Sequence, residues 1–133
     1  MSLRETAPMT PQEARQLNPL RLAHVGDTVW DLMVRCRLLG SGKTVHHMHE
    51  GAVGFVNAHA QAESLGRLQP LLTEDEADIV RRGRNTHAHH AAPKNQDPAD
   101  YAAATALEAL IGYLYLTGED ERIRQLFAAA MEG

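Results

Sequence analysis

The chain has little cysteine, few aromatic residues and no long uninterrupted apolar run. Cys36 is the one cysteine among 133 residues, so no disulfide forms within a chain, and a reducing cytosol is indicated. The first ten residues lack the apolar stretch of a secretory signal. The most apolar segment, Ala102–Leu116, carries Thr105 and Glu108 and is too short and too polar at its centre to span a bilayer. We therefore expect a cytoplasmic protein with no membrane partner.

A surplus of positive charge is also missing. The chain has 13 Lys and Arg against 17 Asp and Glu, for a net charge of −4. This charge does not indicate a nucleic-acid binder, so binding of RNA requires that the basic residues gather on one surface. Aromatic residues make up 5% of the chain, while alanine and leucine are plentiful, which favours helices over sheets.

What the sequence does contain is apolar spacing at the helical period, punctuated by capping residues. Thr10, Asn18 and Thr73 are suited to cap helices, and Glu76 completes a capping box with Thr73. Residues 85–97 have no apolar period and are predicted to form an exposed loop. We predict an all-α fold, one domain over residues 1–133, with helices at about 11–17, 19–39, 44–68, 74–84, 98–116 and 119–131.

Two of these helices have predicted core faces that a structure can check. The face expected in the second helix comprises Leu22, Val25, Val29, Leu32, Met33 and Cys36. The face expected in the third helix comprises Val45, Met48, Ala52, Phe55, Val56 and Ala60.

Asp27 and Glu108 each lie in the middle of an apolar helical segment. A carboxylate in a packed helix is costly unless it is paired or binds a metal. Two such groups on different helices can converge on one Mg²⁺, which prefers oxygen ligands and can activate water and neutralise charge on a phosphodiester. The alternative is that each carboxylate faces solvent or bonds an arginine such as Arg21 or Arg35. Periodicity alone favours that alternative, and spacing does not show that the two carboxylates meet.

The sequence motifs that contain these two carboxylates resemble those of a known family. LAHVGDTVWDLMVR (residues 22–35) resembles the first signature helix of the ribonuclease III family, and ALEALIGYLYLTG (residues 106–118) resembles the second. The chain most resembles the Mini-ribonuclease III subfamily, a catalytic domain without a double-stranded-RNA-binding domain. Four more segments carry this resemblance: GKT at 42–44, AQAE at 60–63, RRGRN at 81–85 and PKNQD at 93–97.

The resemblance implies an all-helical, homodimeric endoribonuclease that uses Mg²⁺, or Mn²⁺ as a substitute, to cut double-stranded RNA. Each subunit is expected to cut one strand, leaving a 5′-phosphate and a short 3′ overhang. The implied role is maturation of the large-subunit (23S) ribosomal RNA precursor, with ribosomal assembly intermediates as further partners. By position, Asp27 and Glu108 are the implied catalytic metal ligands. Longer members of the family have further carboxylates where this chain has Leu20, Ala23 and Thr105.

Basic and amide residues near the predicted loop are candidate RNA contacts. A cluster of basic residues at the C-terminal end of a helix is by itself explained by a favourable interaction with the helix dipole. Beside a signature of this kind, contact with the RNA backbone is the better interpretation, because duplex RNA is recognised through shape, 2′-hydroxyls and phosphates. The candidate RNA-binding residues are Arg81, Arg82, Arg84, Asn85, Lys94 and Asn95.

Two other functions remain open from the sequence. One is a catalytically silent dimer that binds double-stranded RNA, against which the retention of Asp27 and Glu108 argues. The other is a zinc protein, because imidazole is a zinc ligand, although no cysteine pairs accompany the histidines. The histidine clusters are His46, His47 and His49, and His87, His89 and His90.

Overall fold

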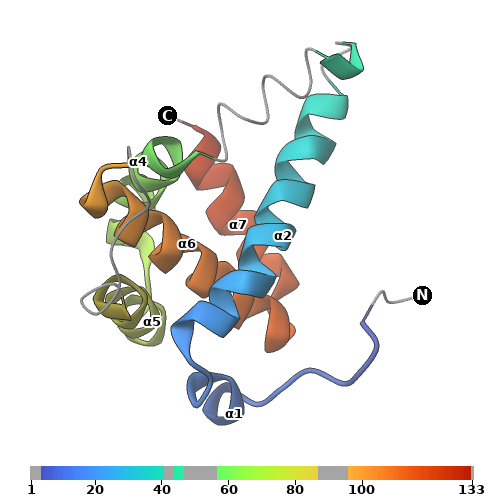
Figure 1. Cartoon of the computed structure of the whole chain (residues 1–133). Coiled ribbons are helices and arrows are strands. Elements are labelled where there is room, and N and C mark those ends of the chain that lie inside the picture. Colours follow the sequence, from blue (N-terminus) through green and yellow to red (C-terminus); the bar gives the residue numbers. More distant parts are fainter. Residues whose placement is uncertain (1–3, 41–43, 47–56, 87–95, 133) are drawn as a thin grey trace.

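A computed structural model describes residues 4–40, 44–46, 57–86 and 96–132. Within these ranges the regular structure is helical and no strand occurs, which confirms the all-α prediction (Figure 1). No helix in the described part of the chain is both long and apolar enough to cross a membrane. The elements are α1 (Pro11–Arg15), α2 (Pro19–Leu39), α4 (Ala58–Leu68), the 3-10 helix η1 (Gln69–Leu71), α5 (Glu74–Asn85), α6 (Pro98–Leu116) and α7 (Asp120–Met131).

The capping residues predicted from the sequence start their helices. The Asn18 side chain accepts a hydrogen bond from the Leu20 amide at 2.8 Å, so α2 begins at Pro19 and runs to Leu39. Thr73 and Glu76 form both halves of the capping box at the start of α5. These short polar side chains satisfy amides that have no partner within the helix, which explains why sequence alone located these starts.

The predicted continuous helix over 44–68 is wrong. Asn57 has extended backbone angles (φ −71°, ψ 158°), and its side chain accepts from the Ala60 amide at 2.9 Å. It is therefore a cap at which α4 begins, because an Asn side chain competes for nearby backbone amides. Val45 is 82% exposed rather than part of a core face, and the predicted face residues Met48, Ala52, Phe55 and Val56 lie outside the described residues.

Helix α6 forms the centre of the fold. It packs against α2, α4, α5 and α7, and Figure 1 shows it (orange) between α2 on one side and α4 and α5 on the other. Its buried residues include many small side chains, which let neighbouring helices approach closely. At one such place, a Cβ added to Gly83 of α5 would lie 2.8 Å from the Ala106 Cα of α6. The buried residues of α6 include Ala103, Ala104, Ala106, Leu107, Ala109, Leu110, Ile111 and Leu114.

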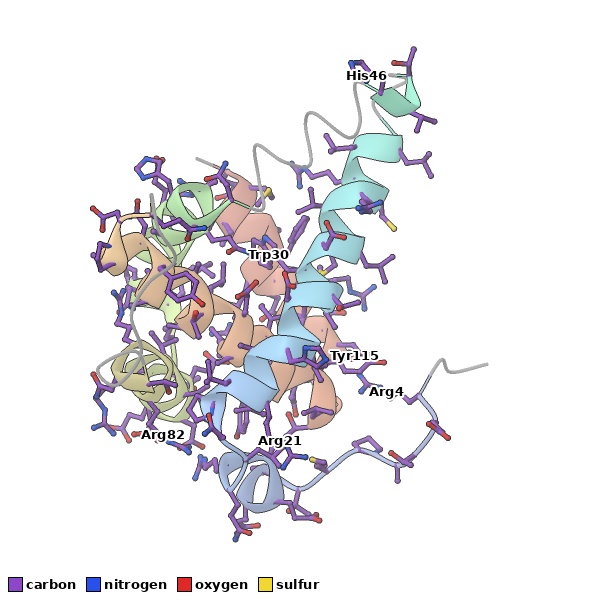
Figure 2. The ribbon with its side chains drawn as sticks, in the orientation of Figure 1. Arg4, Arg21, Trp30, His46, Arg82 and Tyr115 are labelled. Atoms are coloured by element: carbon purple, nitrogen blue, oxygen red, sulfur yellow. The ribbon has the colours of Figure 1, made fainter. Side chains whose placement is uncertain are left out.

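The buried face of α2 agrees only in part with the predicted one: Leu22 is buried, and Val29 and Met33 pack against the core. Trp30 and Val34 are buried, and the Trp30 ring packs edge-on against Phe127 of α7 at 5.1 Å, pointing into the interior in Figure 2. Leu32 is 54% exposed and Cys36 is also exposed, so their assignment to the core was wrong. The reason is tertiary: α2 is rotated so that the line through Leu22, Gly26, Trp30 and Val34 faces α6 and α7.

Candidate active site

Helices α2 and α6 touch through their backbones at two glycines. A Cβ placed on Gly26 would lie 1.7 Å from the carbonyl oxygen of Glu108, and one placed on Gly112 would lie 1.9 Å from the carbonyl oxygen of Leu22. No real side chain tolerates such distances, so each glycine is required by the helix crossing. Because Gly26 precedes Asp27 and Gly112 is one turn after Glu108, this crossing also sets the position of the carboxylates.

The crossing brings Asp27 and Glu108 within hydrogen-bonding reach of each other. Glu108 is half-buried at the base of the site, whereas Asp27 is exposed at its rim. Arg35, an alternative partner for Asp27, instead bonds Asp31 at 2.9 Å. In the part of the chain that the structure describes, no ion pair joins Asp27 or Glu108 to a basic side chain. The structure therefore places two acidic groups together without a neutralising cation from the described residues.

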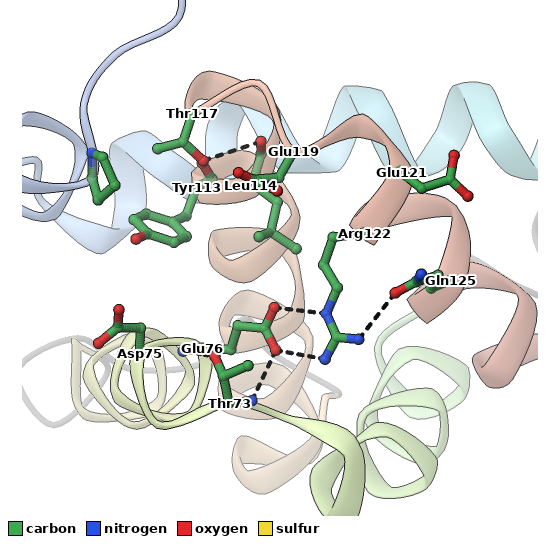
Figure 3. A pocket seen from close by; sticks show the side chains of 11 residues that line it. Thr73, Asp75, Glu76, Tyr113, Leu114, Thr117, Glu119, Glu121, Arg122 and Gln125 are labelled. Atoms are coloured by element: carbon green, nitrogen blue, oxygen red, sulfur yellow. Dashed lines mark hydrogen bonds and ion pairs between the residues drawn. The ribbon is translucent and has the colours of Figure 1, made fainter.

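Two glutamates of this protein show how the charge of a neighbouring side chain changes the pKa of a buried carboxyl group. Burial and the neighbouring Asp27 raise the pKa of Glu108 from 4.5 to about 8. Burial would also raise the pKa of Glu76, but Arg122 and Thr73 lower it below its ordinary value. Figure 3 shows the Arg122 guanidinium facing both Glu76 oxygens, at 2.8 Å each, in a cleft between α5 and α7. Glu76 is thus a satisfied structural ion pair, and Glu108 is an uncompensated acid of the kind found at functional sites.

The Asp27 and Glu108 pair fits a hard divalent cation. Carboxylate oxygens are the preferred ligands of Mg²⁺, and a cation between the groups would remove the repulsion that now favours a proton on Glu108. Among the described residues, no cluster of three or more His, Cys, Asp or Glu side chains is arranged to hold a metal. Two protein ligands suit Mg²⁺, which commonly keeps several waters, and do not suit a structural zinc site.

The candidate RNA-binding residues of α5 have different environments. Arg84 and Asn85 are exposed at the C-terminal end of the helix. Arg81 is also exposed and pairs with Asp78. The Arg82 guanidinium donates to the Arg15 carbonyl at 2.9 Å and so ties α5 to α1, at the lower left of Figure 2. Lys94 and Asn95 lie outside the described residues, as do His47, His49, His87, His89 and His90.

Sequence reasoning missed the structural roles of Gly26, Gly112 and Gln61. A glycine in place of alanine within a helix costs about 1 kcal/mol of stability, so a glycine there usually has a packing reason. Gly26 and Gly112 were therefore a sequence signal that two backbones approach closely. Gln61 of α4 is 2% exposed, and its amide lies beside the Glu108 carboxyl. Gln61 belongs to the AQAE segment that carries the family resemblance, but no periodic pattern distinguishes a buried glutamine from an exposed one, so its place beside Glu108 was not predicted.

Comparison with known proteins gives concordant matches over most of the chain. A family model described as "Ribonuclease III domain" matches residues 20–119. A Mini-ribonuclease 3 from Symbiobacterium thermophilum is 50% identical over 117 residues, covering 87% of this chain and 89% of that protein. A Mini-ribonuclease 3 from a Thermoanaerobacter species is 40% identical over 131 residues, covering 98% of this chain and 92% of that protein.

A solved structure is also similar. The crystal structure of a protein from Fusobacterium nucleatum superposes with a TM-score of 0.81 at 29% sequence identity. The match covers 90% of this chain and 97% of that one, so the two proteins share nearly their whole helical fold.

Proposed function

Because the chain belongs to the ribonuclease III family, in its Mini-ribonuclease 3 subfamily, and is an endoribonuclease, we propose that it hydrolyses double-stranded RNA at Asp27 and Glu108. The proposed catalytic unit is the single domain, and it requires a divalent cation, Mg²⁺ or Mn²⁺. The observation that carries this proposal is the contact between two carboxyl groups that have no basic partner among the described residues. The raised pKa of Glu108 records the same lack of compensation.

The chemistry follows from what each residue offers. A bound divalent cation supplies activation of water and neutralisation of the charge that develops on the phosphodiester. Asp27, exposed at the rim, is accessible from solvent, and Glu108, at the base, is held on the most buried helix of the fold. The reaction breaks the bond between phosphorus and the 3′ oxygen, so the product strand carries a 5′-phosphate. One chain holds one such pair of carboxylates, so cutting both strands of a duplex calls for a homodimer.

The proposed substrate is the 23S ribosomal RNA precursor, free or in ribosomal assembly intermediates in the cytoplasm. The resemblance of the sequence to the Mini-ribonuclease III subfamily supports this role, while the names of the relatives support the ribonuclease activity alone. The proposed contacts to the RNA backbone are the α5 residues Arg81, Arg84 and Asn85, together with Lys94 and Asn95 of the following segment. Arg82 is a weaker candidate because its guanidinium is already bonded to the Arg15 carbonyl.

Cleavage is expected to depend on both the duplex and the cation. A 5′-labelled RNA duplex incubated with the protein and Mg²⁺ should give discrete products, while EDTA should abolish them and added Mg²⁺ should restore them. The same labelled strand, kept single-stranded, is the control and should stay intact. Binding of the duplex without metal-dependent cutting would contradict the proposal and favour the catalytically silent dimer.

Arg84 is expected to contribute one phosphate contact. In the described residues no carboxylate pairs with it, and it is exposed at the C-terminal end of α5, so Arg84→Ser should weaken binding of every duplex similarly. The slope of the logarithm of the RNA association constant against the logarithm of the salt concentration should fall in magnitude by about one. Arg124→Ser on α7, where Arg124 pairs with Glu121 at 2.5 Å, is the matched control and should leave the slope unchanged. An unchanged slope in Arg84→Ser would exclude the contact.

A further inference from the structure

A buried hydrogen-bond donor without a partner lies in the candidate active site. Most buried polar groups in folded proteins are hydrogen-bonded, so each exception calls for an explanation. In the described residues, the buried side-chain atoms that lack a partner are Arg15 Nε, Trp30 Nε1 and Gln61 Nε2. Of these three, Gln61 is the one whose side chain lies beside Glu108.

The position of Gln61 is set by α4 rather than by the carboxylates. Its backbone amide donates to the Asn57 carbonyl at 3.0 Å in the first turn, and α4 packs on α6. The side chain is 2% exposed, so water does not satisfy its amide. The Gln61 amide lies beside the Glu108 carboxyl, which is therefore the acceptor next to this unpartnered donor. A donor held in this place fixes the orientation of that carboxyl, as the hydrogen-bond partners of metal ligands do.

We propose that Gln61 is a positioning residue for the nuclease reaction: its Nε2 donates to the Glu108 carboxyl and thereby orients that carboxyl to hold a divalent cation. The inference rests on the proposed function of Asp27 and Glu108 and extends it to a third helix. It also gives the unpartnered Nε2 a role, because α4 holds this donor beside a carboxyl that can accept from it. Mutation of a hydrogen-bond partner that orients a metal ligand in this way typically lowers metal affinity or activity by about 10–100-fold.

The test compares Gln61→Met and Gln61→Asn with Ser64→Ala. Methionine fills similar space without a donor, and asparagine keeps the amide but withdraws it from Glu108. Ser64 is the matched control because it is equally buried, one turn along α4, and its hydroxyl bonds Arg67 at 3.3 Å rather than Glu108. The measurements are Mg²⁺ affinity by calorimetry, kcat and KM on duplex RNA, and the Tm of the metal-free protein.

Both Gln61 variants should bind Mg²⁺ about 10–100-fold more weakly and lose kcat by a similar factor, with KM for RNA within about twofold. The Tm of metal-free Gln61→Met should equal or exceed that of the wild type, because an unsatisfied buried donor has been removed. Ser64→Ala should match the wild type in Mg²⁺ affinity and kcat.

The proposal is overturned if either Gln61 variant that folds binds Mg²⁺ and cuts RNA as the wild type does. A lower Tm with wild-type Mg²⁺ affinity would overturn it as well, since that result assigns Gln61 a packing role. Should Gln61→Met fail to fold, Gln61→Asn decides the question alone. Full activity in Asp27→Asn and Glu108→Gln would instead contradict the proposed function, whatever the Gln61 variants do.

Discussion

Replacing Asp27 by Asn, or Glu108 by Gln, should reduce cleavage of duplex RNA by at least about 1000-fold at saturating Mg²⁺. Each substitution removes a charged oxygen from a site that has two protein ligands for the cation. A bound cation lowers the activation free energy by several kcal/mol, and each 1.36 kcal/mol corresponds to a tenfold change in rate. Single-turnover cleavage of a labelled duplex measures this loss directly. Affinity for the duplex should stay within about threefold, because phosphate contacts elsewhere supply most of the binding free energy.

Asp31→Asn is the matched control for the first substitution. Asp31 lies one turn after Asp27 on the same helix and pairs with Arg35 at 2.9 Å, so its loss should leave cleavage nearly unchanged. Near-normal cleavage by both Asp27→Asn and Glu108→Gln would refute the assignment of the site.

Glu108→Gln should also change how stability depends on pH in the metal-free protein. The pKa of Glu108 is about 8 in the folded chain, against 4.5 for the ordinary glutamate of an unfolded chain. Below pH 4.5 both states hold the proton, and stability is unaffected. As the pH rises from 4.5 to 8 the unfolded state releases this proton first, so the wild type loses stability, and the loss levels off above pH 8.

The expected loss is on the order of 2–4 kcal/mol, because about 1.4 kcal/mol accompanies each pKa unit and solvent screens part of the effect at this half-buried site. Urea unfolding in EDTA at pH 5 and pH 8 measures it. The difference in unfolding free energy between the two pH values should be smaller in Glu108→Gln than in the wild type. Equal differences in the two proteins would show that Glu108 is not held protonated.

Gly26→Ala should destabilise the protein by about 3–5 kcal/mol or prevent folding. The new methyl group would lie 1.7 Å from the Glu108 carbonyl oxygen and 2.7 Å from the Gly112 nitrogen, which are backbone atoms of a central helix. Relief therefore requires that α2 and α6 separate, and this exposes the core between them. Thermal unfolding followed by circular dichroism should show a Tm lower by more than about 10 °C, or no cooperative transition.

Gly66→Ala is the control for the glycine prediction. Gly66 is also inside a helix, α4, and a Cβ there meets nothing within 4 Å. Alanine should stabilise this position by about 0.5–1 kcal/mol, since it restricts the unfolded chain and favours the helix. If Gly26→Ala instead behaves like Gly66→Ala, the close backbone contact of α2 and α6 does not exist as described.

Local sequence signals predicted where several helices begin and end, but not every cap or which face of a helix is buried. The start of α2 after Asn18, its end at Leu39 and the capping box of Thr73 were predictable, because each depends on a few neighbouring residues. The helix predicted over 44–68 failed at Asn57, where apolar spacing on both sides concealed a cap. The face of α2 was predicted only in part, because apolar residues on both sides of that helix left its rotation undecided: Leu22 is buried, whereas Leu32 and Cys36 are exposed.

The sequence by itself determined the helical class, most helix ends, and the presence of Asp27 and Glu108 inside apolar helices. Only the tertiary structure decided that these carboxyl groups meet and that Gln61 lies beside Glu108. The reason is that helix signals act over one or two turns, whereas the meeting depends on how α2 and α6 cross. That crossing is set by backbone contact at Gly26 and Gly112, a long-range fit that no local pattern expresses.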